Sequence, residues 1–160
     1  MNTSRFVLTG LATSFVNLAL HGVIYFVFLR GFYAAHPGGS EELQKQLVKG
    51  GDQLVVWSLL LSALALGFFI TVVVRWSGAK TFASGLGAGL LFGGLYWAGM
   101  DFGLYASSNT FSLASTLVDI ACSTLCMATS AGFAAWMLHR GAARRTSHDS
   151  SARAAREATA

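Results

Sequence analysis

Three ionisable side chains lie within long apolar stretches of this sequence: His21, Asp101 and Asp119. Ionisable groups are costly in the interior of a membrane, and those found there usually bind or relay ions, protons or ligands. At about 1.5 Å per helical residue, His21 and Asp119 are expected at similar depths in the outer half of a membrane, and Asp101 near its outer boundary. These residues are the first candidates for a polar site within the membrane.

Two polar stripes surround these candidates at helical spacing. In the first apolar stretch, residues that recur every four positions share one helix face: Thr13, Asn17, His21 and Tyr25. The last stretch carries a longer series, which comprises Ser112, Ser115, Thr116, Asp119, Cys122, Ser123, Cys126, Thr129 and Ser130. We predict that the two stripes face each other, because polar side chains favour one another over lipid.

The sharpest prediction concerns Asp119, which we expect to point into the bundle with Asn17 or His21 as its partner. Ser123 lies one turn beyond Asp119 and completes the candidate set, while Met127 is expected to face lipid. This arrangement indicates a small polar cavity for a proton, an ion or a lipid headgroup. The alternative is interhelical hydrogen bonding that only holds the helices together, worth about 0.6 kcal/mol per contact.

The elements that must position these residues are expected to be membrane-spanning helices. Hydrophobic residues make up 54% of the chain and charged residues 11%, whereas soluble domains carry about 25% charged residues. A chain of 160 residues cannot bury that much apolar surface in one core. Four stretches reach the length of about 20 residues that a span needs: about 6–29, 53–74, 81–105 and 111–138. The sequence therefore predicts an all-α integral membrane bundle of four transmembrane helices over about residues 1–138.

Basic residues near the ends of these stretches predict the orientation of the chain. They are Arg5, Arg75, Lys80, Arg140, Arg144 and Arg145. With four spans all of them fall on one side, so both termini are expected in the cytoplasm. Residues 139–160 are expected to form a basic, disordered cytoplasmic tail. This tail supplies most of the net charge of +4, which therefore does not indicate nucleic-acid binding.

Small residues in the third stretch predict close helix packing. Gly85, Gly89 and Gly93 form two overlapping G-x-x-x-G units, which let two helix backbones approach closely. We expect this face to make the closest helix contact in the molecule. Its partner is expected to be a helix of the same chain, and the alternative is a homo-oligomer or a larger membrane complex.

No motif in the sequence specifies a reaction. P-loop, nucleophile-elbow and H-E-x-x-H patterns are absent. Cys122 and Cys126 lie one helical turn apart and are expected to act as packing residues, since one nearby His leaves too few ligands for zinc. We therefore expect neither a metal nor a cofactor, and the lipid bilayer is the expected partner.

The end of the third stretch and the start of the fourth carry two aspartates in a recurring pattern. M-D-F-G-L-Y-A over residues 100–106 closes one span with Asp101, and T-L-V-D-I over residues 116–120 opens the next with Asp119. This segment resembles a family of small bacterial four-helix integral membrane proteins of unknown function. The family has Thr-Asn where this chain has Gly103-Leu104, and Trp-Gly where it has Ala121-Cys122. The resemblance implies a multi-pass protein of the bacterial cytoplasmic (inner) membrane and gives no activity.

Three classes of function stay open. The leading interpretation is a non-catalytic packing or accessory subunit with a polar intramembrane seam. A small proton- or ion-coupled transporter or channel using Asp119 and His21 is the second, and a membrane enzyme or a lipid- or quinone-binding protein is the third. A dry seam with every polar group paired would favour the first, a water-filled route past Asp119 the second, and a ligand beside His21 and Ser123 the third.

Overall fold

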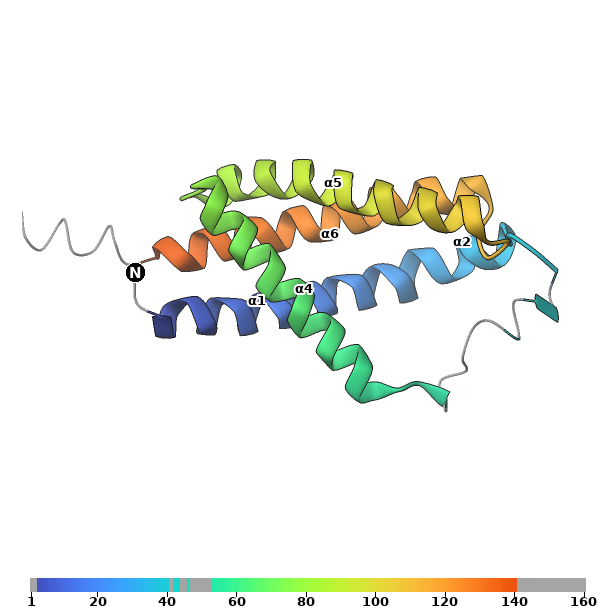
Figure 1. Ribbon diagram of the computed structural model, residues 1–160, viewed down its shortest axis with the longest axis horizontal. Helices are drawn as coiled ribbons and strands as arrows, with labels where there is room; N and C mark the ends of the chain where they lie inside the picture. The colour runs from blue at the N-terminus through green and yellow to red at the C-terminus, as the bar shows by residue number, and fades with distance from the viewer. Residues whose placement is uncertain (1–2, 41, 44–45, 47–52, 141–160) are drawn as a thin grey trace, which may run out of the picture.

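The computed structural model describes residues 3–40, 42–43, 46 and 53–140, and over these ranges the chain is helical without a β-strand (Figure 1). The first helix consists of α1 (Thr3–Ile24), the π-helical turn η1 (Tyr25–Leu29) and α2 (Arg30–Ala35), which follow one another without a break. Three further long helices are α4 (Val56–Ser77), α5 (Phe82–Ser107) and α6 (Leu113–His139). The predicted all-α fold is confirmed.

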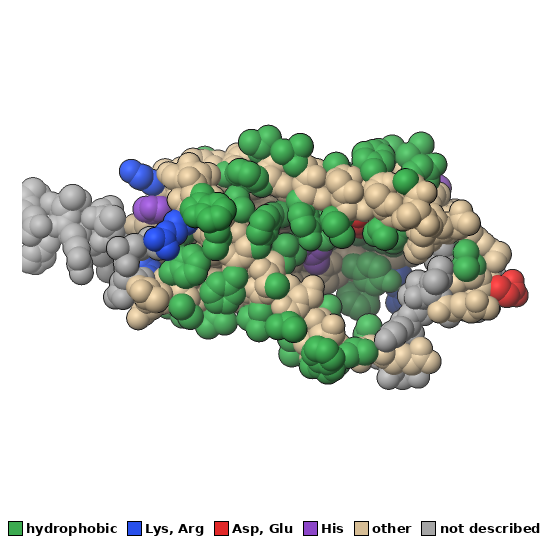
Figure 2. Space-filling view, viewed as in Figure 1, with side chains coloured by type: hydrophobic (Ala, Val, Ile, Leu, Met, Phe, Trp, Pro, Cys, Tyr) green, Lys and Arg blue, Asp and Glu red, His purple; other side chains and the backbone are tan. Residues whose placement is uncertain are grey.

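Three of these helices are long and apolar enough to cross a membrane, and they are Thr3–Ala35, Val56–Ser77 and Leu113–His139. Their outward faces are apolar as well, because large side chains such as Phe15, Phe26 and Trp76 are exposed (Figure 2). A soluble protein rarely exposes so much contiguous apolar surface. The fourth long helix of the bundle, α5, is not among these three, because its many glycines add little to its hydropathy.

The first helix runs further than the sequence predicts, to Ala35 instead of about residue 29. A π-turn holds about one residue more than an α-turn, so η1 rotates the residues after it by about 100° relative to a regular helix. The helix ends where His36 leaves helical geometry and its N–H donates to the carbonyls of Phe32 and Tyr33. Pro37 follows, and it disfavours the helical conformation at the residue before it.

Helix α5 packs along α6 through the predicted glycine face. Gly85, Gly89 and Gly93 are all buried against α6 of the same chain. A Cβ added at Gly89 would lie only 2.5 Å from the Cα of Ala128, so the two backbones are in direct contact there. Met127 fills the space beside Gly93 and is 1% exposed, so the prediction that it faces lipid is wrong. A glycine on one helix leaves space, and an apolar side chain of the neighbouring helix fills it and is buried there.

Helix α4 crosses the other helices obliquely (Figure 1). At the crossing point a Cβ added at Gly67 would lie 2.4 Å from the Cα of Ser14. This approach is at least as close as that of Gly89, so the glycine face of α5 does not stand alone as the closest helix contact. The buried residues of α4 all lie between Gly67 and Val74, in its second half. Its first half diverges, and the corresponding half of the bundle is left without cover from α4 (Figure 1).

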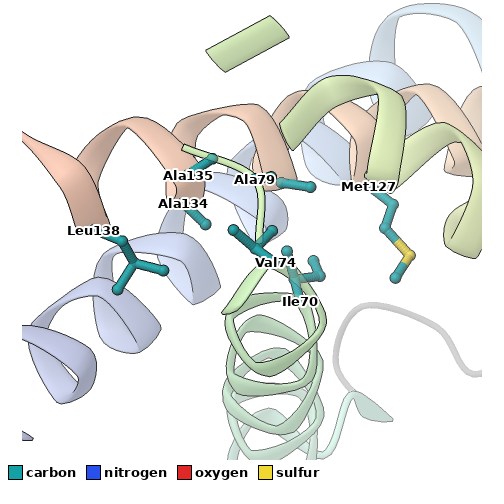
Figure 3. Packing of buried hydrophobic residues seen from close by; sticks show 8 residues of the cluster. Ile70, Val74, Ala79, Met127, Ala134, Ala135 and Leu138 are labelled. Atoms are coloured by element: carbon teal, nitrogen blue, oxygen red, sulfur yellow. The ribbon is translucent and has the colours of Figure 1, made fainter. Parts of the chain in front are cut away.

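The apolar core lies where the second half of α4 meets α6. Ile70 and Val74 of α4 pack with Ala134, Ala135 and Leu138 of α6 (Figure 3). Small alanines on α6 let the larger α4 side chains approach the helix backbone closely. This cluster fixes one end of the bundle, while the polar candidates lie in the other half.

Both ends of the described chain lie at the same end of the bundle (Figure 1). The guanidinium of Arg5 donates to the backbone carbonyl of Arg140, and Arg75 lies 5.7 Å from the ring centroid of Phe6. The α4–α5 connection, with Lys80, lies at this end too, and basic side chains gather there in Figure 2. Most of the predicted tail, residues 141–160, lies outside the described residues.

Candidate functional site

A cavity of about 290 Å³ lies between the second half of the first helix and the first half of α6. Ile24, Leu29, Phe111 and other apolar or aromatic side chains form most of its wall. Its polar members are His21, Tyr33, Asp119 and Ser123, and both thiols of the chain border it. In this half of the bundle, which α4 does not cover, Figure 2 shows a hollow with a His and an acidic side chain at its back.

His21 presents a free acceptor at this cavity. Its Nδ1 lies 2.9 Å from the carbonyl oxygen of Asn17. A carbonyl can only accept, so Nδ1 carries the hydrogen, and Nε2 of the neutral ring is left as an acceptor. Nε2 is buried and has no partner among the described residues. The indole of Trp97 lies against the ring at 5.8 Å between centroids, and its Nε1–H is likewise buried without a partner.

Asp119 borders the cavity, but its partner differs from the predicted one. The Oη–H of Tyr33 donates a hydrogen bond to Oδ1 of Asp119. Asn17, one of the two expected partners, instead accepts from Ser130 at 3.1 Å, which lies about 16 Å further along α6. The expectation that Asn17 or His21 pairs with Asp119 is therefore wrong. The physical cause of this difference is the length of the first helix. The helix ends at Ala35, so Asn17 lies further from its end than it would in a span that ends near residue 29.

Asp101 lies behind Asp119. It is 8% exposed, its carboxyl lies close to that of Asp119, and its Oδ2 is buried without a partner in the described part of the chain. Asp101 is one of the four buried residues of α5, together with Gly85, Gly89 and Gly93 of the glycine face.

Tyr33 is the site residue that the sequence analysis missed. It continues the four-residue series of the first helix through Tyr25 and Leu29, which was a signal for including it. In a regular α-helix, however, each four-residue step drifts by about 40°, so the series would leave the inward face within a few turns. The π-turn η1 reverses part of this drift and returns Tyr33 to face α6. Hydropathy and spacing carry no sign of that turn.

A hydrogen-bonded connection between the end of the first helix and the start of α6 holds Tyr33 beside α6. The carbonyl of His36 accepts from the hydroxyls of Ser112 at 2.9 Å and Ser115 at 2.8 Å, while the Ser112 side chain also caps the start of α6. Pro37 forms an antiparallel bridge with Phe111, and a Cβ added at Gly38 would lie 2.4 Å from the Phe111 backbone. The end of the first helix and the start of α6 are thus fixed to each other.

The remaining candidates divide between the cavity and the helix interfaces. The cavity is lined by His21, Asp119 and Ser123, and Asp101 lies next to Asp119. Asn17 belongs to the contact between α1 and α6. Within the described ranges, no three His, Cys, Asp or Glu residues are close enough to hold a metal ion. The two cysteines are free thiols. The cavity therefore offers acceptors, hydroxyls and thiols in an apolar setting.

Comparisons with protein-family models, with curated proteins and with solved structures find no match to this chain. The resemblance of residues 100–120 to small bacterial membrane proteins thus stays a prediction.

Proposed function

We propose that this chain is a membrane protein that binds a small, mostly apolar molecule in the cavity between its first helix and α6. The molecule carries a hydrogen-bond donor, which meets the Nε2 of His21. The observation behind this proposal is the buried, unpartnered Nε2 at the edge of a cavity. A buried acceptor without a donor costs about 1–3 kcal/mol, so a ligand that supplies the donor is favoured.

The pattern of unpaired groups supports this function over packing alone. In a seam that only held the helices together, the buried polar groups would be paired. Side-chain atoms of His21, Trp97 and Asp101, however, are buried without partners among the described residues. A quinone offers only carbonyl acceptors and would not meet the Nε2 of His21, whereas a hydroxyl or an amine would. Binding does not require a reaction, and no catalytic step is proposed.

The proposal includes four membrane spans, with α5 as the third crossing and both termini in the cytoplasm. At about 1.5 Å per residue, the 26 residues of α5 reach about 39 Å, enough for a hydrocarbon core of about 30 Å. Arg5, Arg75, Lys80 and Arg140 all lie at the end of the bundle that holds both termini, as the bias for cytoplasmic basic residues requires. The bacterial inner membrane is proposed from the resemblance of residues 100–120.

The test is to purify the chain from its native membrane in mild detergent and to identify the small molecules that accompany it by mass spectrometry. His21→Phe keeps a flat ring of similar size but removes the acceptor. His139→Phe is the matched control, because the Nδ1 of His139 makes the same contact to a carbonyl four residues earlier, at 3.1 Å, far from the cavity.

A small molecule should accompany the wild-type chain and His139→Phe in near-stoichiometric amount, and be lost from His21→Phe. Equal retention by His21→Phe and His139→Phe, or no bound molecule in any of the three, would count against the proposal. Circular dichroism of each variant checks that the helices are intact, so that a loss of ligand is not a loss of fold.

A further inference from the structure

We propose that the ligand of this cavity is a small organic cation, an ammonium group on an apolar body. This inference rests on the proposed function, because it names the chemical class of the molecule that the cavity binds. It is carried by three features of the site: two neighbouring acidic side chains without a basic partner among the described residues, an acceptor without a donor, and an aromatic wall.

The two aspartates make one end of the site acidic. Asp119 borders the cavity, and Asp101 lies close behind it. No Lys or Arg of the described residues forms an ion pair with either aspartate. Asp101 is more than nine-tenths buried and its Oδ2 has no partner. A carboxylate in such a setting needs a counter-ion, and an ammonium group from outside the chain would supply it.

The hydrogen-bonding atoms at the cavity also require a donor. The hydroxyl hydrogen of Tyr33 is already given to Asp119. The Nε2 of His21, an acceptor, remains open, as do the acidic group of Asp119 and the hydroxyl of Ser123, which can accept as well as donate. A primary ammonium has three donors and no acceptor, which matches these groups, whereas an alcohol has one donor and no charge.

The wall of the cavity suits the cation and its apolar body. The rings of Tyr25, Tyr33 and Phe111 all border it, with centroids 6.4 Å apart for Tyr25 and Tyr33 and 6.0 Å apart for Tyr33 and Phe111. Aromatic faces attract cations, most strongly when water is excluded. A volume of about 290 Å³ lies at the lower end of the range for ligand cavities, so the ligand is small.

The test compares two soluble probes of the same size, phenethylamine, which is cationic at neutral pH, and phenethyl alcohol, which is neutral. Affinities for the full chain in detergent micelles are measured by isothermal titration calorimetry. We expect the amine to bind about tenfold more tightly than the alcohol, since charge-assisted hydrogen bonds are about twice as strong as neutral ones. Asp119→Asn should reduce this ratio to near one, because the amide has a similar size but no charge. His139→Phe, which changes a side chain far from the cavity, should preserve it.

Each outcome decides the question. Equal affinity for both probes in the wild-type chain overturns the cation proposal while leaving the cavity as a ligand site. A preference for the amine that persists in Asp119→Asn also overturns it, and binding of neither probe counts against the cavity itself. The wild-type ratio and His139→Phe test the charge preference even if Asp119→Asn fails to fold.

Discussion

The contact between α5 and α6 predicts a graded response to the same small substitution at three glycines. A Cβ on Gly89 would lie 2.5 Å from the Cα of Ala128 and 2.7 Å from the Cβ of Ala131, whereas a Cβ on Gly87 would meet nothing within 4 Å. Carbon atoms in contact sit about 3.5–4.0 Å apart, so Gly89→Ala must separate the two helices by about 1 Å. At Gly93 the nearest atoms, at 3.2–3.3 Å, belong to the side chain of Met127, which can shift.

The expected free energies of unfolding follow from these distances. Overpacking at a backbone contact costs about 1–3 kcal/mol, and replacement of glycine by alanine within a helix returns about 0.5–1 kcal/mol. Gly89→Ala should therefore lose about 1–2 kcal/mol, Gly93→Ala should be nearly neutral, and Gly87→Ala should gain about 0.5–1 kcal/mol. Unfolding in mixed micelles with increasing SDS, followed by circular dichroism, measures all three. Equal stability of Gly89→Ala and Gly87→Ala would refute the packing of this face on α6.

Three further predictions use the same assay. Gly67→Ala should destabilise the chain by about 1–2 kcal/mol, because its Cβ would meet the α1 backbone at 2.4 Å, and a neutral effect would contradict the α4 crossing. Deletion of Val27 within η1 should be tolerated, because it turns the π-turn into an α-turn. Deletion of Leu11 should unfold the chain, because it rotates one half of a regular helix by about 100° relative to the other half. A chain that tolerates deletion of Leu11 but unfolds on deletion of Val27 would contradict the role given to η1. Ser115→Ala should cost about 1 kcal/mol through its lost hydrogen bond to the His36 carbonyl, and no loss of stability would show that this contact is unimportant.

The positions of the later helices could be predicted from the sequence because long apolar runs with polar ends define them. The stretch expected at about 111–138 is α6 at Leu113–His139, and that expected at about 81–105 is α5 at Phe82–Ser107. The polar stripe of α6 was confirmed in most of its members, since Ser115, Ser123 and Ser130 are buried. Thr129 of the predicted stripe is exposed, so its inclusion was wrong. Periodicity within one helix is a local property, and the sequence carries it directly.

The geometry between helices could not be predicted in the same way. The partner of Asp119 depends on a single π-turn, which moves Tyr33 onto the inward face and has no counterpart in hydropathy. Met127 is buried because Gly93 on the facing helix leaves room for it, which its own helix does not reveal. The contact between Asp101 and Asp119 likewise arises from the pairing of two helices. In each case the deciding residue belongs to another element.

A ligand in the cavity beside His21 would cover the chain's own thiols, and their reactivity tests whether it is there. The sequence has two cysteines, and both border the cavity, so alkylation needs no engineered label. The measurement is the rate of modification of Cys122 by N-ethylmaleimide in native membranes, with mass spectrometry of the Cys122 peptide. We expect slow, equal rates in the wild-type chain and in His139→Phe, where the ligand covers the thiol, and a several-fold faster rate in His21→Phe. The same rate in all three proteins would contradict a ligand held by His21.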